Sequence, residues 1–181
     1  MKLRNSIAGA IVAAAALVPT LAPAPALAQT RTFTDTVDQP GGYDQISRVK
    51  VTYGPRALTI RIVSGADGSF SDHFHVYLDT AGHGYPEWFV GTYAEVERWG
   101  MSRANKWASD ESAAPLGRPG CSGDAHYAFS ATPATVWISI PNRCIGRPPR
   151  VRVNVESVFE TGTVFDRLPT RYHWTPWVRR G

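Results

Sequence analysis

The chain of 181 residues has few hydrophobic stretches, and only one of them, over residues 7–18, is long and uninterrupted. Its twelve residues are too few for a membrane span, which needs about 20. Lys2 and Arg4 precede this run, and Ala26-Leu27-Ala28 follows it as a small-residue cleavage pattern. We therefore predict a secretory signal peptide over residues 1–28, with an uncleaved N-terminal membrane anchor as the alternative.

Strong charge of one sign is also lacking. Removal of Lys2 and Arg4 with the signal peptide lowers the formal net charge from +4 to +2. Such a balance argues against a dedicated nucleic-acid-binding protein. The remaining residues, 29–181, are enough for one domain with its own core, and no later segment reaches transmembrane length.

A helical pattern is missing as well. Only residues 94–107 approach a 3.6-residue apolar repeat, and Gly100 interrupts it. Period-two alternation dominates instead, and it predicts strands with one apolar and one polar face. The inward set is predicted to comprise Val49, Val51, Tyr53, Leu58, Ile60, Ile62, Val136, Ile138, Ile140, Val151, Val153 and Val155. The pattern indicates an all-β fold: a single antiparallel β-sandwich of roughly eight strands, jelly-roll-like, with residues 166–181 as an extended C-terminal tail.

Cysteine is scarce, with Cys121 and Cys144 as the only two. The absence of an earlier cysteine excludes a lipid anchor at a new N-terminus. In an exported chain an isolated pair is most simply a disulfide. A metal-binding pair and a free catalytic thiol are the alternatives, although no Cys-x-x-Cys or neighbouring histidine motif accompanies them.

The polar stretch "HFHVYLDTAGHGYPEW", residues 73–88, is the most chemically suggestive part of the chain. As a strand, it sends Phe74, Val76 and Leu78 into the core and a polar set to the opposite face, where we expect solvent. That polar set consists of His73, His75, Tyr77 and Asp79. A zinc or copper site, in which His83 or Asp79 completes the pair His73 and His75, is the competing hypothesis, although a His-x-His pair alone is a weak signal.

Two segments resemble a known group of proteins. "DTVDQPGGYDQISRVKVTYGPRALTIRI", followed by "HVYLDTAGHGYPEWFV", resembles the first half of a domain of exported proteins from high-GC Gram-positive bacteria, most of them uncharacterised. "CSGDAHYAFSATPATVWISIPNRCIGRPPRVRVNVES" resembles the second half. The likeness spans about residues 34–158 and implies a β-sandwich with a disulfide. The chain departs from the pattern at Asn142 and Tyr85, where the group has proline and glycine.

The first half is also distantly similar to DOMON domains and family-nine carbohydrate-binding modules, which are β-sandwiches that hold sugars, haem or calcium. Oxygen ligands from the loops of such a sandwich suit calcium. A calcium site is therefore a candidate at Asp35, Asp38, Asp44 and Asp79. The alternative is that these aspartates are turn formers.

Motifs that identify an enzyme are lacking. "GCSGD" at 120–124 lacks the closing glycine of a nucleophile elbow, and no glycine-rich phosphate loop is present. A glycosidase needs a pair of carboxylates across a cleft. The spacing of the available glutamates (Glu87, Glu95, Glu97, Glu156 and Glu160) singles out no such pair.

Aromatic residues, in contrast, are abundant, with six tryptophans and seven tyrosines. Trp137 alternates with Val136 and Ile138 and is predicted to point outward. We expect its strand to form a hairpin with the strand that carries Arg150 and Arg152, giving an aromatic and guanidinium surface for a sugar. Covering of the sheet or pinning of the tail is the alternative role for the aromatics.

These observations predict a secreted, monomeric, non-catalytic binding module for a cell-wall or environmental glycan. No nucleic-acid partner and no membrane span are expected. A secreted hydrolase with an unrecognised carboxylate pair and a structural or interaction protein are the competing hypotheses. The sequence names neither the ligand nor a cofactor beyond calcium.

Overall fold

The computed structural model describes residues 27–35, 45–64, 73–93, 96–104, 107, 120–128, 134–158, 164–170 and 172–181. These residues contain twelve β-strands. The first six strands are β1 (Gln29–Thr34), β2 (Ile46–Tyr53), β3 (Ala57–Ser64), β4 (His73–Asp79), β5 (Trp88–Tyr93) and β6 (Arg98–Arg103). The others are β7 (Ser122–Asp124), β8 (His126–Ala128), β9 (Ala134–Pro141), β10 (Arg150–Val158), β11 (Val164–Leu168) and β12 (Val178–Arg179).

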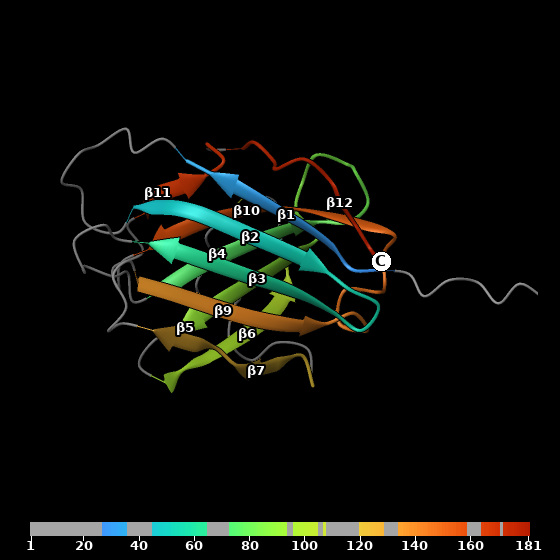
Figure 1. Cartoon of the computed structure of the whole chain (residues 1–181), viewed down its shortest axis with the longest axis horizontal. Helices are drawn as coiled ribbons and strands as arrows, with labels where there is room; N and C mark the ends of the chain where they lie inside the picture. The colour runs from blue at the N-terminus through green and yellow to red at the C-terminus, as the bar shows by residue number, and fades with distance from the viewer. Residues whose placement is uncertain are drawn as a thin grey trace, which may run out of the picture.

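The strands form two antiparallel sheets packed as a sandwich (Figure 1). The five-stranded sheet has the order β1-β2-β3-β9-β8. The seven-stranded sheet has the order β11-β10-β4-β5-β6-β7, and β12 also pairs with β10. The predicted all-β sandwich is thus confirmed. Roughly eight strands were expected because β7, β8 and β12 are only two or three residues long, too short for alternation to reveal them.

The core lies between the inner faces of the two sheets. Every residue of the predicted inward set is buried, as are Phe74, Val76 and Leu78 of β4. Trp88, Trp99 and Met101 extend the core from β5 and β6. Alternation therefore assigned the inner face correctly, because side-chain direction in a strand is a local property.

The predicted hairpin between β9 and β10 is wrong. β9 pairs with β3 and β8 in the five-stranded sheet, whereas β10 pairs with β4, β11 and β12 in the other sheet. Residues 142–149 therefore cross from one sheet to the other. Sequence proximity favoured a hairpin, but the apolar inner faces of these two strands are buried against opposite sides of the core.

The polar face of β4 is buried rather than solvated, which corrects the second expectation. His75, Tyr77 and Asp79 are between 0 and 5% exposed. Residues 172–181, which we call the C-terminal segment, cover part of this face: Trp174 packs on a cluster that includes Tyr77 and Phe89. The segment is fixed to β10, since the backbone N–H of Thr175 donates to the carbonyl of Val153 at 3.1 Å and its hydroxyl accepts from the N–H of Val153 at 2.9 Å.

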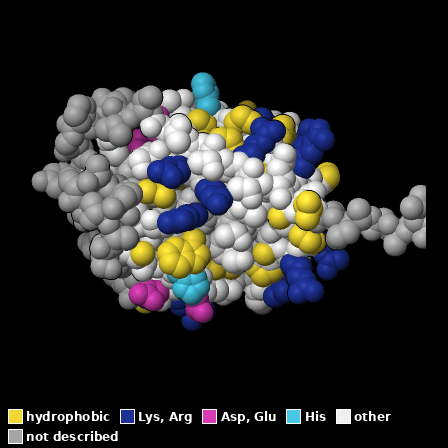
Figure 2. All heavy atoms as spheres, in the orientation of Figure 1, with side chains coloured by type: hydrophobic (Ala, Val, Ile, Leu, Met, Phe, Trp, Pro, Cys, Tyr) yellow, Lys and Arg dark blue, Asp and Glu magenta, His cyan; other side chains and the backbone are white. Residues whose placement is uncertain are grey.

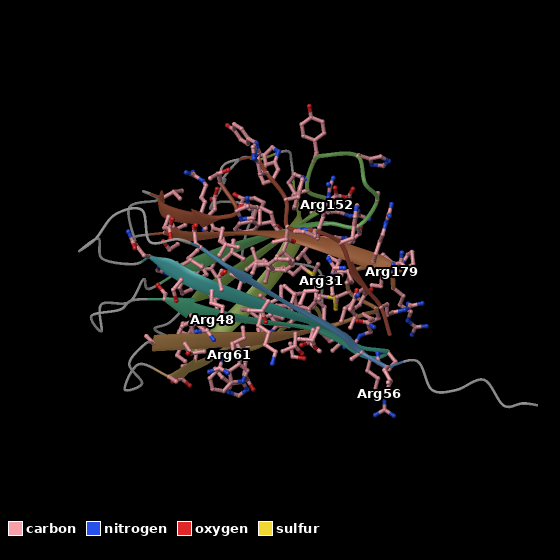
Figure 3. The ribbon with its side chains drawn as sticks, turned by 45° about the horizontal axis from the view of Figure 1, so that its top comes forward. Arg31, Arg48, Arg56, Arg61, Arg152 and Arg179 are labelled. Atoms are coloured by element: carbon pink, nitrogen blue, oxygen red, sulfur yellow. A yellow bond between two sulfur atoms is a disulfide. The ribbon has the colours of Figure 1, made fainter. Side chains whose placement is uncertain are left out.

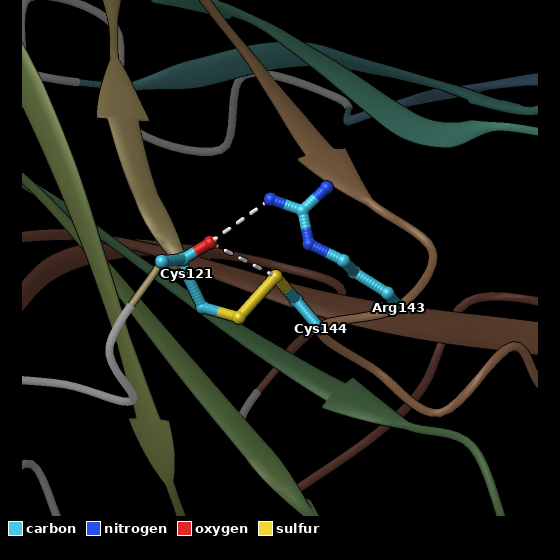
Figure 4. Close-up of a disulfide and its surroundings, with 4 residues drawn as sticks. Cys121, Arg143 and Cys144 are labelled. Atoms are coloured by element: carbon cyan, nitrogen blue, oxygen red, sulfur yellow. Dashed lines mark hydrogen bonds between the residues drawn. A yellow bond between two sulfur atoms is a disulfide. The ribbon is translucent and has the colours of Figure 1, made fainter.

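The disulfide between Cys121 and Cys144 is present and joins the two sheets (Figure 4). Cys121 immediately precedes β7 of the seven-stranded sheet, and Cys144 lies in the turn after β9 of the five-stranded sheet. Arg143 donates a hydrogen bond to the carbonyl of Gly120 at 3.3 Å beside this bond. The disulfide therefore fixes the 142–149 crossover to the edge of the opposite sheet.

No described segment forms a helix long and apolar enough to cross a bilayer. The predicted signal peptide lies outside the described residues up to position 26. β1 begins at Gln29, directly after the predicted cleavage point.

Replacing both cysteines by serine is expected to lower the free energy of unfolding by about 3 kcal/mol, because the unfolded chain regains the entropy of a closed loop. Urea unfolding followed by tryptophan fluorescence measures the difference. Arg143→Gln, which removes only the neighbouring exposed hydrogen bond, is the control and should change stability by less than about 1 kcal/mol. Two free thiols in the non-reduced protein would contradict the bond.

His75 makes stability depend on pH. Burial, assisted by the neighbouring His73, lowers the pKa of His75 to about 4 from its usual 6.5. The unfolded chain therefore binds a proton between pH 6.5 and 4 that the folded chain does not. Stability from this residue is complete above pH 6.5 and decreases by about 3 kcal/mol as the pH falls to 4.

Urea unfolding between pH 7 and 4.5 checks this dependence. The variant His75→Phe keeps a ring beside Phe89, whose centroid is 4.8 Å from that of His75, but cannot titrate. Its stability should decrease less over this range than that of the wild type. His83→Gln is the control for the loss of an exposed histidine, because the side chain of His83 is 76% exposed. Equal slopes for wild type and His75→Phe would refute the effect.

Candidate functional site

On the outer face of the five-stranded sheet, one row of side chains crosses all five strands. The cross-strand pairs Thr32↔Lys50, Lys50↔Arg61, Arg61↔Trp137 and His126↔Trp137 link β1, β2, β3, β9 and β8 in turn. We call these five residues the central row. Neighbouring strands lie about 4.8 Å apart, so the row extends about 19 Å.

A second row, which we call the hydroxyl row, lies beside the central row, two residues further along each strand on the same face. Its pairs are Thr30↔Thr52, Thr52↔Thr59 and Thr59↔Ser139. The hydroxyls of Thr30 and Thr52 are 3.0 Å apart and hydrogen-bonded. A hydroxyl both donates and accepts, so this row offers both kinds of hydrogen-bonding group to a ligand.

Residues of both rows line an open hollow of about 410 Å³. Lys50, Thr52, Thr59, Arg61 and Trp137 line it. This volume lies within the range of about 300 to 1,000 Å³ that is usual for small-ligand sites. The hollow thus combines two cations, two hydroxyls and one indole ring.

The ring of His126 packs against the indole of Trp137. The two rings are stacked, with centroids 5.3 Å apart and planes 28° from parallel. The indole remains 38% exposed, which confirms that it points outward. An aromatic ring supported on one side and open on the other can act as a stacking platform.

Basic side chains dominate the middle of this face. Arg48 precedes Lys50 by two residues on β2, so the two side chains share a face and lie about 7 Å apart along the strand. In Figure 2 dark-blue side chains lie in the centre and also along the right-hand side of the view, and acidic side chains appear only towards the edges. Figure 3 shows Arg48 and Arg61 on the neighbouring strands β2 and β3, well apart from Arg152 on β10.

The structure separates the residues that were predicted to form the sugar-binding surface. Trp137 lies on the five-stranded sheet, whereas Arg150 and Arg152 lie on the seven-stranded sheet. Arg152 donates to Asp79 from Nε at 2.8 Å and from Nη2 at 2.6 Å. Its guanidinium carbon also lies 4.7 Å from the ring centroid of Trp177. Arg150 contacts the same ring at 4.2 Å, so these arginines fix the C-terminal segment.

The proposed metal ligands are found in different environments. Asp79 is fully buried, and besides Arg152 it accepts hydrogen bonds from the N–H groups of Ala81 and Gly82 at 3.1 and 2.6 Å. Asp38 and Asp44 lie outside the described residues, so the calcium site that includes them and Asp35 stays a prediction. Among the described residues, no group of three or more His, Cys, Asp or Glu side chains could hold a metal ion.

Of the glutamates considered for hydrolysis, Glu87 and Glu156 make contacts within the fold, whereas Glu97 is exposed. Glu87 accepts the N–H of Thr80 at 2.6 Å, and Glu156 pairs with Arg167 at 2.6 Å. Glu95 and Glu160 lie outside the described residues.

Sequence reasoning missed Lys50, Arg61 and His126 as parts of the site. The same alternation that gives the inward set puts Lys50 and Arg61 on the polar faces of β2 and β3, because each lies between two inward residues. The turn at Gly54-Pro55-Arg56 could have aligned them, because it joins these strands in a hairpin whose register pairs Lys50 with Arg61. No local signal brings β9 to β3 or β8 to β9.

Comparison with models of known protein families, with curated proteins and with solved structures finds no match to this chain. The functional assignment therefore depends on the geometry of the hollow and of the rows that form it.

The Asp79–Arg152 pair is expected to stabilise the fold rather than to bind a ligand. Asp79 has no exposure and the side chain of Arg152 is 21% exposed, so Asp79→Asn leaves a largely desolvated guanidinium without its counter-charge. We expect a loss of about 3 kcal/mol in the free energy of unfolding, measured by urea denaturation. Asp124→Asn, at an exposed carboxylate on β7, is the matched control and should cost less than about 0.5 kcal/mol. A loss below 1 kcal/mol at Asp79 would refute the assignment.

Proposed function

We propose that this protein is a secreted, non-catalytic binding module that holds a glycan on the outer face of its five-stranded sheet. The observation that carries the proposal is the hollow, where an exposed indole lies beside two cations and two hydroxyls. A sugar ring has an apolar face that can stack on an indole and an edge of hydroxyls that need donors and acceptors. The hollow supplies both.

The rigidity of the site supports this function. The five residues that line the hollow come from the three adjacent strands β2, β3 and β9, so no loop has to close over the ligand. Binding on a preformed surface avoids the cost of ordering a flexible segment. The site is also open, which suits a polymer that extends beyond the hollow along either row.

Secretion is supported by two features. The sequence begins with a signal-peptide pattern, and the fold contains a disulfide that links the two sheets. Disulfides persist in oxidising compartments outside the cytosol. The resemblance to exported β-sandwich proteins and to carbohydrate-binding modules agrees with the same proposal.

Replacing Trp137 by alanine should weaken glycan binding by about fivefold or more, because stacking on an aromatic ring contributes about 1 kcal/mol. The measurement is retardation of the mature protein in affinity electrophoresis through gels that contain individual polysaccharides. Trp137→Phe keeps a ring and should retain part of the retardation. Urea unfolding should show less than about 1 kcal/mol of destabilisation for either variant, since the ring is partly exposed.

Tyr172→Ala is the control for loss of an exposed aromatic residue. Tyr172 is 52% exposed and contacts Trp107, and it belongs to the C-terminal segment away from the hollow. This variant should retain wild-type retardation. Glycan binding that depends on Tyr172 but not on Trp137 would overturn the proposed site, and polysaccharide cleavage by the wild type would overturn the non-catalytic function.

A further inference from the structure

We propose that the glycan is an acidic polysaccharide whose carboxylate groups bind between Lys50 and Arg61. This inference rests on the proposed function and adds the chemical class of the ligand. The ligand is a carboxylate-bearing sugar polymer. The carboxylate, the hydroxyls and the ring of one sugar residue contact the cations, the threonines and the indole of the hollow, respectively.

The first argument is the repulsion that the free protein tolerates. Lys50 and Arg61 are directly opposite each other on β2 and β3, where Cβ atoms are about 4.5 to 5.5 Å apart. Like charges in such a pair destabilise a sheet. Arg48 adds a third positive charge one step along β2. A bound anion would reverse this unfavourable interaction.

The second argument is that the described strands of this sheet supply no counter-charge. The outward positions of the five strands, from Thr30 to Thr34 on β1 through Ala128 on β8, include no aspartate or glutamate among the described residues. None of the ion pairs found in the described part of the chain involves Arg48, Lys50 or Arg61. These three cations are therefore available to an external anion.

The other sheet shows that the chain pairs its arginines where their role is structural. Arg152 is held by Asp79 at 2.6 Å, and Arg167 is held by Glu156 at 2.6 Å. The contrast between the two outer faces separates cations that stabilise the fold from cations that are left for a ligand.

The third argument is the match between the hollow and a uronic-acid residue. The ammonium of Lys50 and the fork of Arg61 suit a carboxylate, and Arg61 can bind it with two parallel hydrogen bonds. Thr52 and Thr59 offer partners for the sugar hydroxyls, and Trp137 offers a platform for the ring. A neutral glycan would use the last two features and leave both cations unpaired.

Single-stranded nucleic acid is the competing polyanion, because bases also stack on tryptophan. Two observations favour the polysaccharide. Among the described residues of this face, Trp137 is the one exposed indole, and His126 is already stacked on its ring. The hydroxyl row runs directly beside the cations and suits the many hydroxyls of a sugar polymer.

The test compares two polymers that share a backbone and differ in charge: polygalacturonic acid and its fully methyl-esterified form, with single-stranded oligodeoxynucleotides as a third ligand. Isothermal titration of the mature protein should show binding of polygalacturonic acid that is at least about tenfold tighter than that of the ester and that weakens with added salt. Lys50→Gln and Arg61→Gln should each remove most of this difference. Trp137→Ala should weaken binding of both polysaccharides.

Arg56→Gln is the matched control, because Arg56 is an exposed arginine in the β2–β3 turn of the same sheet and lies outside the rows (Figure 3). It should change affinity less than about twofold. Lys50→Gln and Arg61→Gln should also leave the urea midpoint of the free protein unchanged or raised, which separates loss of binding from loss of folding.

Three results would overturn the inference. Equal affinity for the ester and the acid, with Trp137 still required, would remove the acidic ligand and leave the proposed function intact. Tighter binding of the oligonucleotide than of polygalacturonic acid would assign the cations to nucleic acid. Binding of polysaccharides that is unaffected by Trp137→Ala, Lys50→Gln and Arg61→Gln alike would overturn both the inference and the proposed site.

Discussion

The pairing of β3 with β2 on one edge and with β9 on the other is the constraint on which the candidate site depends. Side chains alternate between faces, so this register sends Leu58, Ile60 and Ile62 into the core and Thr59 and Arg61 to the outer surface. A slip of one residue would exchange the two sets. Burial of the apolar set therefore fixes the positions of the polar set.

Local alternation explains how much of this structure can be predicted from the sequence. It assigned the core positions and the outward direction of Trp137, because both depend only on neighbouring residues in one strand. It could not identify strand partners. β9 and β10 follow one another in the sequence and yet lie in different sheets, because each apolar face needs an opposite sheet to pack against.

The environment of a strand face is likewise a non-local property. The polar residues of β4 looked solvated because their sequence is polar, but Trp174 and Thr175, about a hundred residues later, cover that part of the sheet. Arg152 was expected to be available to a sugar, because the sequence does not show that Asp79 on the neighbouring strand pairs with it. The site residues that the sequence did not reveal as partners, Lys50 and Arg61, belong to strands that were otherwise assigned correctly.

The two outer faces of the sandwich consequently have different roles. The C-terminal segment covers part of the seven-stranded sheet, where Asn154 donates to the carbonyl of His173. On the same sheet Arg152 pairs with Asp79, and Arg167 pairs with Glu156. The five-stranded sheet has its central row open to solvent, with cations that lack a described partner. The ion pairs of Arg152 and Arg167 thus lie on one sheet, and the opposite sheet presents its cations to solvent.

The contacts of Asp79 also have an evolutionary consequence. This carboxylate orients Arg152, and Arg152 lies 5.3 and 4.7 Å from the ring centroids of Trp174 and Trp177. Side chains that share contacts in this way have non-additive effects on stability when they are replaced. A substitution at one of these positions therefore changes which substitutions are acceptable at the other three. In related sequences, these four positions should co-vary as a group.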